Sequence, residues 1–362
     1  MSSDITQFKL TAFDSADIPE IARKWKDNDR VLRFEQAYIW YQVLLKYIKS
    51  KNDIGMVAVL LNDVNDLALV LPVIFRKKFL FNQIVPIANY YTSLFEILEL
   101  DDSPSGPTSY RTLLSNLLAN RAWDQMTLGP MDKGGKSFSR IIEACEQLGI
   151  PYTTYYWFDN YTLDLSSVDY ENYYNQLPSR LRNTIKRKSR KLEASFDGYD
   201  FKMINGRENI DEAIRNFETV YDRSWKKKEG NPEFIREFST RAAEEGWLRL
   251  GILRLNGQLA AAQLWYVKDG IASIFKLAHC EEFRQYSVGT LLFHEIIKNL
   301  LLHEGITTID FLIGDDNYKK DWGFKKRERW GIMLINSKSI AGKLLYLRHI
   351  ALPRIIHFSR QI

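Results

Sequence analysis

A short turn followed by a strongly periodic helix carries the residues that best fit a chemical task. The turn reads Arg-Gln-Tyr-Ser-Val-Gly over residues 284–289, and leucine and isoleucine then recur at three- and four-residue steps over residues 291–301. The first turn of an α-helix has backbone N–H groups that lack intrahelical acceptors, and the helix dipole is positive there. This stretch therefore predicts a site for a phosphate or another anion.

Side chains that could move protons follow this helix. Asp310 lies near the carboxyl end of an apolar run, residues 306–313, where a carboxylate could orient or deprotonate an ammonium group. A strand-end aspartate is equally expected to accept a hydrogen bond from a neighbouring backbone N–H, so both roles stay open. Tyr318 and Lys319 could bind a phosphate or a sugar of an acceptor.

Metal and hydrolase chemistry fit the sequence poorly. The histidines at positions 279, 294 and 303 have no ligand partners at metal-binding spacing. Asp315 and Asp316 are adjacent acids in a glycine-rich turn, which is more typical of helix capping than of a metal site. A Gly-x-Ser-x-Gly elbow is absent from the sequence. We therefore expect no metal ion and no serine hydrolase.

Two apolar strands must position the turn. Residues 271–278 and 306–313 flank the helix, so the unit reads strand, helix, strand. Such a crossover is right-handed when the two strands are parallel, and it places the helix N-terminus at the carboxyl end of the first strand. The anion site should lie there.

The turn resembles the acyl-CoA pyrophosphate loop of the GNAT acetyltransferases, whose pattern is Arg/Gln-x-x-Gly-x-Gly/Ala. Arg284 and Gly289 match this pattern, while Ser287 stands where a glycine is usual. A serine can cap a helix with its hydroxyl and leave the backbone amides free, so we expect the departure to be tolerated.

Further motifs resemble one branch of this family. Trp225-Lys226, an Asn256-Gly257 hairpin, the loop itself and the stretch from Asp310 to Trp322 occur in the order found in FemAB-like GNAT proteins of the cellulose-biosynthesis CelD type. The resemblance covers roughly residues 160–340 well and residues 1–160 only in outline.

The resemblance implies roles for individual residues. A backbone N–H near the end of the first strand would polarise the thioester carbonyl, the loop amides with Arg284 would take the pyrophosphate, and Tyr318 would protonate the leaving thiolate. Tyr318 lies one residue further from Gly323 than the family pattern has it. The implied acyl-CoA-binding residues are Leu277, Ala278, Arg284, Tyr286, Ser287, Val288, Gly289 and Thr290; the catalytic ones are Tyr318 and Asp310; the substrate-binding ones are Lys319, Trp322 and Trp225.

The predicted fold class is α/β (α+β), with tandem GNAT-like domains that each have a mixed central sheet flanked by helices. The first half follows the GNAT order in outline, but Pro104, Gly106 and Pro107 occupy its loop position, so it is either a degenerate GNAT-like domain or a plain structural partner. The expected segments are a degenerate domain (1–165), an acyltransferase domain (166–337) and a basic amphipathic tail (338–362).

Positive charge is concentrated in the second half. The net charge of the chain is +5, yet residues 1–165 hold 17 Lys and Arg against 20 Asp and Glu. Residues 180–191 contain seven cations and no acid, which predicts either a solvated helix face or a surface for phosphates. No carboxylate side chain follows Glu328, so the tail could dock on the protein core or lie on an anionic membrane.

The number of cysteines and the length of the apolar runs indicate the cellular compartment of the protein. Cys145 and Cys280 are the only cysteines, which favours a reducing compartment. Residues 1–10 do not look like a secretory signal, and no apolar run reaches the ~18–20 residues that a membrane span needs. We expect a cytoplasmic protein, with peripheral contact at the inner face of the membrane as a variant of that expectation.

The predicted function is transfer of an acyl group from acyl-CoA to an amine, on an amino sugar or on an envelope or exopolysaccharide precursor by family association. One alternative is a FemAB-type transferase that uses aminoacyl-tRNA and acts on a peptidoglycan precursor. Another is a non-catalytic binding subunit of a polysaccharide system, in which Ser287 would mark a loop that no longer binds the donor.

Overall fold

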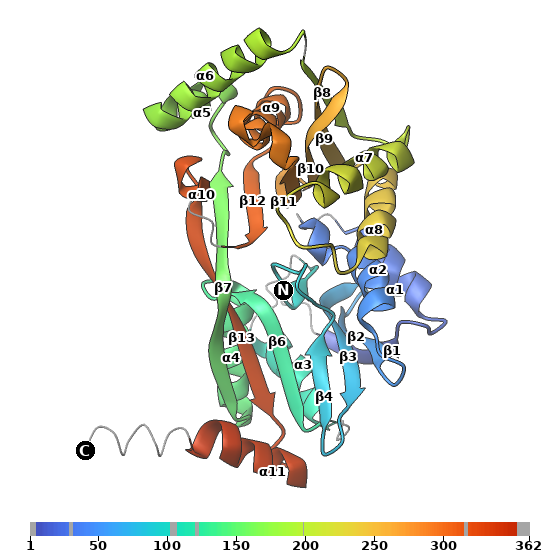
Figure 1. Cartoon of the computed structure of the whole chain (residues 1–362). Helices are drawn as coiled ribbons and strands as arrows, with labels where there is room; N and C mark the ends of the chain where they lie inside the picture. Colours follow the sequence, from blue (N-terminus) through green and yellow to red (C-terminus); the bar gives the residue numbers. More distant parts are fainter. Residues whose placement is uncertain are drawn as a thin grey trace, which may run out of the picture. The chain divides into compact units, whose positions relative to one another are not determined.

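The computed structural model of the protein describes residues 5–28, 32–101, 107–119, 123–197, 199–314 and 318–352, without the side chains of Ile5, Thr6, Pro107 and Tyr318. These residues form two compact units, whose elements are labelled in Figure 1. Unit 1 holds the described residues up to 28, from 35 to 158 and from 328 to 352; unit 2 holds residues 32–34 and the described residues from 159 to 327. The units alternate along the chain, whereas the sequence predicted three consecutive segments.

Unit 1 is a mixed sheet with flanking helices. Its strands lie in the order β1, β2, β3, β4, β6 and β13, and neighbours are antiparallel except for β4 and β6. The strands are β1 (Ile5–Ala12), β2 (Ile54–Asn62), β3 (Leu67–Lys77), β4 (Asn82–Pro86), β5 (Leu98–Glu99, beside β3), β6 (Gln125–Asp132) and β13 (Lys325–Ile335). The helices are α1 (Ile18–Lys26), α2 (Tyr38–Ile48), α3 (Pro107–Ala119), α4 (Lys136–Leu148) and α11 (Ile340–Tyr346), with single turns η1 (Phe34–Gln36) and η3 (Leu347–Ala351).

Strands β4 and β6, the parallel pair in unit 1, form a GNAT-like crossover. After β4 the chain passes through the short β5 to helix α3 and then to strand β6, and β4 pairs with β6 at Gln83↔Gln125 and Ile84↔Met126. The order of hairpin, helix and strand in this part agrees with the GNAT order in outline that the sequence predicted for the first half. Pro104 and Gly106, at the expected loop position, lie outside the described residues.

Unit 2 repeats the same architecture in fuller form. Its strands lie in the order β7, β12, β11, β10, β9 and β8, and β11 and β12 are parallel. The strands are β7 (Tyr152–Asp164, of which residues 159–164 belong to this unit), β8 (Tyr199–Ile204), β9 (Leu248–Leu255), β10 (Gln258–Lys268), β11 (Ile271–His279) and β12 (Thr308–Ile313). The helices are α5 (Tyr170–Gln176), α6 (Ser179–Ser195), α7 (Ile210–Asp222), α8 (Pro232–Glu244), α9 (Val288–His303) and α10 (Tyr318–Asp321), with a 3-10 turn η2 (Glu281–Tyr286).

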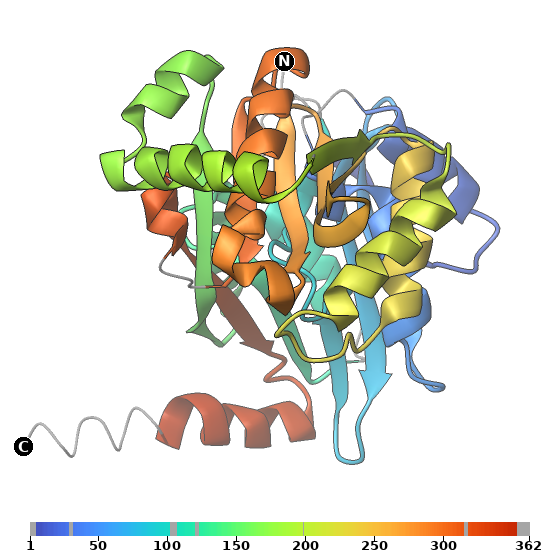
Figure 2. The ribbon, with the colours of Figure 1, turned by 45° about the horizontal axis from the view of Figure 1, so that its top comes forward.

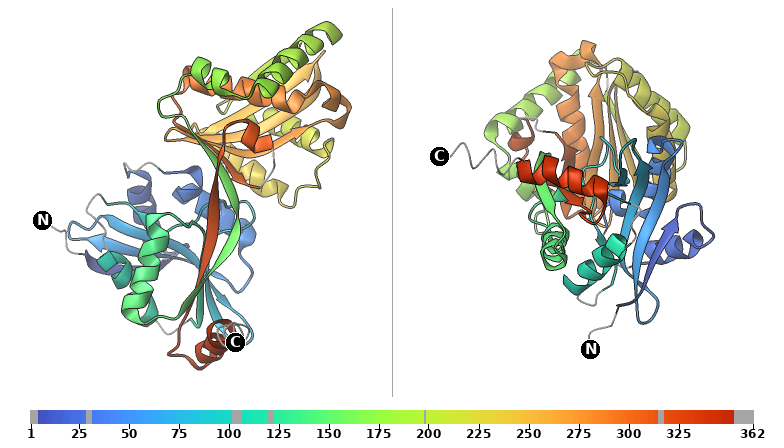
Figure 3. Two further views of the ribbon diagram at one scale, coloured as in Figure 1. Left: turned by 90° about the vertical axis from the view of Figure 1, so that its left-hand side faces the viewer. Right: turned by 90° about the horizontal axis from the view of Figure 1, so that it is seen from below.

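Helices cover both faces of this sheet (Figure 3). Neighbouring residues of β10 show the two faces, because side chains alternate along a strand. The Trp265 ring packs on Phe293 of α9 at 5.3 Å, whereas the Tyr266 ring packs on Phe238 of α8 at 4.9 Å. Gly251 of β9 leaves room for α9, since a Cβ atom there would lie 2.5 Å from the Ile296 side chain.

Several expectations about local structure are confirmed. The fold class is α/β (α+β) with two GNAT-like units, and the basic stretch is a helix, α6. The Asn256-Gly257 turn has positive φ at both residues (46° and 78°), as a type I′ hairpin requires.

As a separate observation, no helix within the described ranges is both long and apolar enough to cross a membrane.

Candidate active site

The two parallel strands of unit 2 separate along their length. β11 pairs with β12 at Ile271↔Thr308, Ala272↔Ile309 and Ser273↔Asp310, and the described part of β12 offers no partner to residues 274–279. On its other edge β11 stays paired with β10 as far as His279. Backbone groups alternate in direction along a strand, so some N–H and C=O groups of residues 274–279 point into the gap. Leu277 and Ala278, the predicted carbonyl-binding residues, lie on this open edge.

A β-bulge interrupts β11 at the start of the gap. Ile274 pairs with Trp265 and Lys276 pairs with Leu264, so Phe275 has no partner of its own on β10. A bulge bends its strand and changes the direction of the groups that follow it. The backbone from Lys276 onwards is therefore turned relative to the paired part of β11.

The predicted anion loop closes the end of the gap. The 3-10 turn η2 ends at Tyr286, Ser287 follows, and α9 begins at Val288. The Ser287 amide donates to Arg284 O at 3.0 Å, and the Thr290 amide donates to Ser287 O at 3.0 Å. Within the described residues, the amides of Val288 and Gly289 have no acceptor. Two of the four predicted loop amides are therefore available to an anion, and two bond within the protein.

Ser287 adopts a backbone conformation that favours glycine. Its φ of 57° and ψ of 38° lie in the left-handed region. The expectation that the hydroxyl caps α9 is wrong, because the Ser287 side chain makes no capping hydrogen bond. The geometry thus gives a physical reason for glycine at this position of the family pattern, and it also explains how serine keeps the loop shape at a cost in strain.

We expect Ser287→Gly to raise the stability of the protein. Relief of left-handed strain should contribute about 1 kcal/mol, reduced by the greater freedom of glycine in the unfolded chain. Thermal unfolding measures the change. Ser195→Gly, in the last turn of α6, is the control and should lower the midpoint instead, because glycine disfavours helix. A lower midpoint for Ser287→Gly would contradict the assignment of strain.

Gly289 lies against the end of β11. A Cβ atom at this position would be 3.3 Å from Nδ1 of His279, which is tighter than most real contacts. Gln263 of β10 donates its Nε2 to Gly289 O at 3.0 Å, and Trp265 Nε1 donates to Gln263 Oε1 at 3.1 Å. The first turn of α9 is therefore tied to the strand beside it, and its glycine allows the close approach.

His279 is a titratable side chain beside Gly289 of the loop. Its ring lies 4.4 Å from that of Trp225, a predicted substrate-binding residue that is itself exposed. Its Nε2 is buried, has no hydrogen-bond partner in the described part of the chain and lies 4.0 Å from Glu281. Burial is the main cause that lowers the pKa of His279; Glu281 opposes it, and Arg284 adds to it.

This lowered pKa predicts a pH dependence of stability. The unfolded chain binds a proton at His279 near pH 6.5, whereas the folded protein binds it only at lower pH. The stabilisation is complete above pH 6.5 and is lost as the pH falls through the lowered pKa. We expect the free energy of unfolding in urea to decline more steeply below pH 6.5 than it does in His279→Gln. Equal slopes would show that His279 is not responsible.

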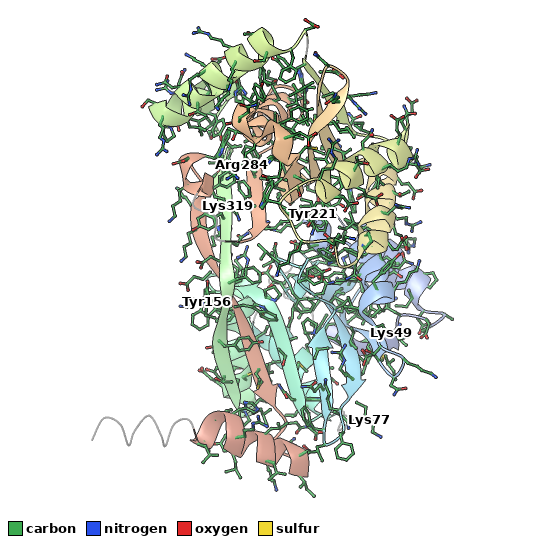
Figure 4. The ribbon with its side chains drawn as sticks, in the orientation of Figure 1. Lys49, Lys77, Tyr156, Tyr221, Arg284 and Lys319 are labelled. Atoms are coloured by element: carbon green, nitrogen blue, oxygen red, sulfur yellow. The ribbon has the colours of Figure 1, made fainter. Side chains whose placement is uncertain are left out.

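The basic helix α6 packs on the loop (Figure 2). The ammonium of Lys188 donates to Gln285 O, and Lys191 Nζ lies 4.9 Å from the centre of the Tyr286 ring. Burial lowers the pKa of Lys188, and the neighbouring cations Lys191 and Arg187 add to the effect. Within the described residues, no carboxylate is in ion-pair distance of the seven cations of α6. Helix and loop therefore form one positively charged region around Arg284, which is labelled in Figure 4.

Asp310 is buried, and both of its carboxylate oxygens accept hydrogen bonds. Its Oδ1 accepts from Asn160 Nδ2 and from the Leu312 amide, both at 2.7 Å, and its Oδ2 accepts from the guanidinium of Arg33. Leu312 has a φ of 55°, and the pairing of β12 with β7 shifts register there. The carboxylate thus holds a strained bulge where β11 and β12 separate. Of the two roles left open by the sequence, the geometry supports the structural one.

Arg33 and Asn160 were missed by sequence reasoning. Arg33 is 277 residues from Asp310, in a segment that joins unit 2 although its chain neighbours belong to unit 1. Phe34 fixes this segment, because its ring lies 4.9 Å from Tyr266 and 5.7 Å from Phe238. Neither residue belongs to a local motif, so one sequence contains no signal for them.

The remaining predicted residues lie after β12. Lys319 is buried, and its Nζ donates to Gly314 O at 2.7 Å and to Ile313 O at 3.4 Å, so it holds the chain that leaves β12. Trp322 is buried against Phe293, with ring centres 4.5 Å apart. Tyr318 begins α10, but its side chain lies outside the described residues, as do Asp315 and Asp316. Among the described residues no cluster of His, Cys, Asp and Glu suits a metal ion.

Comparison with known proteins agrees with this geometry. Residues 179–320 match the family described as Acetyltransferase (GNAT) domain. The match begins at the start of α6 and ends within α10, so it includes the separating strands, the loop and α9. No curated protein sequence matches the chain.

Solved structures share the fold over nearly the whole chain. FemX is 10% identical with a TM-score of 0.62, and the match covers 95% of this chain and 100% of FemX. L-PGS from Bacillus licheniformis is 10% identical with a TM-score of 0.55, covering 93% and 96%. The C-terminal domain of a candidate lysylphosphatidylglycerol synthetase from Agrobacterium fabrum is 11% identical with a TM-score of 0.51, covering 91% and 97%. At such low identity these likenesses establish the fold, which is a FemAB-like GNAT fold.

Proposed function

We propose that the protein is an N-acyltransferase that moves an acyl group from acyl-CoA to an amine at the site in unit 2. The observation that carries the proposal is the combination of a backbone edge on β11 that β12 leaves open with the free amides of Val288 and Gly289 at its end. An open edge can pair with an amide-containing carrier arm, and free amides at a helix N-terminus can hold its phosphates.

In this proposal the donor is held by backbone more than by side chains. Arg284 is largely exposed at the loop and would add a cation to the two free amides. Because the N–H groups of consecutive residues point to opposite edges of a strand, one of the N–H groups of Leu277 and Ala278 faces the open edge, where it would polarise the thioester carbonyl. Such donors need no rearrangement during the reaction, because the bulge and the helix already fix them.

The chemical step requires a neutral amine and a protonated leaving group. The amine nitrogen attacks the thioester carbon, the C–S bond breaks, the nitrogen loses a proton and the thiolate gains one. We assign Tyr318 to the thiolate and treat Asp310 as a positioning residue, because its carboxylate is buried and already accepts three hydrogen bonds. Water can take the proton of the amine in this scheme.

Tyr318→Phe is expected to lower turnover more than it lowers donor affinity, because the hydroxyl acts only when the thiolate leaves. Steady-state kinetics with saturating amine and a separate donor titration give the two quantities. A fall in affinity with unchanged turnover would remove Tyr318 from the acid role.

A cavity in unit 2 suits an amine acceptor. It measures about 330 Å³ and lies between α7 and α8, and its lining includes Glu218, Asp222, Glu229 and Glu233 as well as Tyr221, which Figure 4 labels. Glu229 pairs with Lys276 of β11 at 2.5 Å, so the cavity borders the strand that would hold the donor. The lining also includes Lys228 and Arg236, and Arg236 pairs with Glu218 at 2.8 Å. Four carboxylates thus stand against two cations, and the excess of negative charge would favour an ammonium group. An amino sugar or an envelope or exopolysaccharide precursor, as in the cellulose-biosynthesis CelD-type branch, is the proposed acceptor class.

A second candidate function is transfer from aminoacyl-tRNA. It is favoured by α6, whose unpaired cations lie beside the loop and would suit an RNA backbone. FemX and L-PGS share the fold, which makes this alternative worth a direct test. The third possibility, a binding subunit without catalysis, would fit a loop that Ser287 had disabled.

Calorimetric titration separates these functions. We expect acetyl-CoA to bind, with an affinity that falls as salt rises because the site is cationic. Binding of charged tRNA with no response to acetyl-CoA would replace the proposal with the second function. If neither acetyl-CoA nor charged tRNA binds, the result would favour a non-catalytic subunit.

A further inference from the structure

Unit 1 ends in a hairpin whose tip is apolar and exposed. Strands β3 and β4 are joined by a tight turn in which the Lys78 amide donates to Phe81 O at 2.8 Å. The two residues at its centre, Phe79 and Leu80, are 100% and 76% exposed. A phenylalanine that touches nothing in its own fold gains nothing from folding, so its exposure needs another reason.

Helix α11 presents a second apolar row. Ile340 and Leu344 of α11 and Leu347, the first residue of η3, follow one another at steps of four and three residues, and all three are exposed; we count Leu347 with the exposed row of α11. The opposite side of the helix is already used, because Leu345 and Ile350 pack with Ile335 in a small buried cluster. Helix α11 is therefore apolar on two sides, and one of them faces solvent.

The tip and the helix belong to one surface. Phe81, the last residue of the hairpin turn, packs on the cluster that anchors α11. Figure 1 and Figure 2 show the end of the hairpin beside α11. We call Phe79, Leu80 and the exposed row of α11 the hairpin–helix surface.

The segments that carry this surface contain exposed cations and no acidic residues. The sequence has no Asp or Glu between residues 67 and 95, nor after Glu328. The exposed cations of these segments are Lys77, Lys78, Lys338, Lys343 and Arg348, and Figure 4 labels the first of them. An apolar row flanked by lysine and arginine is the pattern of segments that lie in the interface of an anionic bilayer. In a symmetric contact between two copies these cations would face one another, which disfavours that occupant.

We propose that the hairpin–helix surface binds peripherally to membranes that contain anionic lipid. Phe79 and Leu80 enter the boundary between headgroups and acyl chains, the exposed row of α11 lies along it, and the flanking cations meet lipid phosphates. This proposal is independent of the proposed function, because the surface belongs to unit 1 and shares no residue with the site in unit 2.

Co-sedimentation of the full chain with lipid vesicles tests the proposal. We expect binding to vesicles of phosphatidylcholine mixed with phosphatidylglycerol, weak binding to phosphatidylcholine alone, and release by high salt. The double variant Phe79→Ser, Leu80→Ser should bind at least about tenfold more weakly, from the loss of apolar burial. Lys343→Gln with Arg348→Gln should lose about fivefold for each cation removed.

Two controls keep the result specific. Val64→Ser changes a similarly exposed apolar residue in the turn between β2 and β3, and it should bind like the wild type. A Phe79→Cys variant can carry an environment-sensitive dye, because both native cysteines are buried, and its emission should shift to the blue on vesicles. The second readout does not depend on how a serine variant folds.

Three outcomes would overturn the proposal. One is a wild-type chain that stays in the supernatant with phosphatidylglycerol vesicles. Another is binding that the Phe79 and Leu80 changes leave intact. The third is a chain that light scattering shows to be a dimer which the same changes dissociate, because a second copy would then cover the surface.

Discussion

Gly289→Trp is expected to abolish acetyl-CoA binding while the protein stays folded. An indole at this position would stand in front of the Val288 and Gly289 amides, the two loop donors without an acceptor in the described residues. Hydrogen bonds from such amides to a charged phosphate are worth about 1.5–3 kcal/mol each, so the dissociation constant should rise at least about 100-fold. Isothermal titration with acetyl-CoA measures the change.

The matched control is Gly206→Trp, also in unit 2. A Cβ atom at Gly206 would meet nothing within 4 Å, whereas at Gly289 it meets His279 at 3.3 Å. Gly206→Trp should therefore bind the donor like the wild type, and thermal unfolding should show that both variants are folded. If Gly289→Trp binds acetyl-CoA normally, the donor does not use this loop and the proposed site is wrong.

Asp310→Ala is expected to destabilise the protein by about 3–5 kcal/mol, because it leaves the buried cation of Arg33 without its carboxylate. It also removes the acceptor of the Leu312 amide and one acceptor of Asn160, so the bulge at the end of β12 loses its fixed shape. Urea unfolding measures the loss of free energy. A catalytic base would behave differently, since its removal lowers turnover and leaves stability nearly unchanged.

A double-mutant cycle makes this test specific for the ion pair. Arg33→Met with Asp310→Ala should be less destabilised than the sum of the two single variants, because both single variants remove the same ion pair. Asp321→Ala removes an exposed carboxylate from α10 and should change stability little. Additive losses in the cycle would show that Arg33 and Asp310 do not act as a pair.

Local patterns were enough to predict most elements of unit 2. The periodicity of residues 291–301, the apolar runs on either side and the Asn256-Gly257 turn all report on neighbours within a few residues, and the structure confirms the crossover and the hairpin that they predicted. The cationic stretch at residues 180–191 could also be predicted, because its charges are neighbours in the sequence. Its contact with the loop was not, because Lys188 and Gln285 are 97 residues apart.

The burial and hydrogen bonding of the site residues depend on partners that are far away in the sequence. The sequence placed Asp310 beside the opening of the strands, but only the tertiary structure surrounded it with Arg33, Asn160 and the Leu312 amide. Lys319 and Trp322 likewise occur in a motif that suggested ligand binding, and folding buries both. A side chain's burial is set by whatever packs over it, which spacing along the chain does not specify.

The sequence by itself determined that a turn and a helix connect two parallel strands, with a cationic helix in the same half. The tertiary structure decided which amides of the turn are free, that Ser287 is left-handed, and that Asp310 holds a bulge. The reason is the distance along the chain over which each property is set. Helix periodicity and turn chemistry are short-range properties of the chain, whereas hydrogen-bond satisfaction and burial are settled by residues that folding brings together.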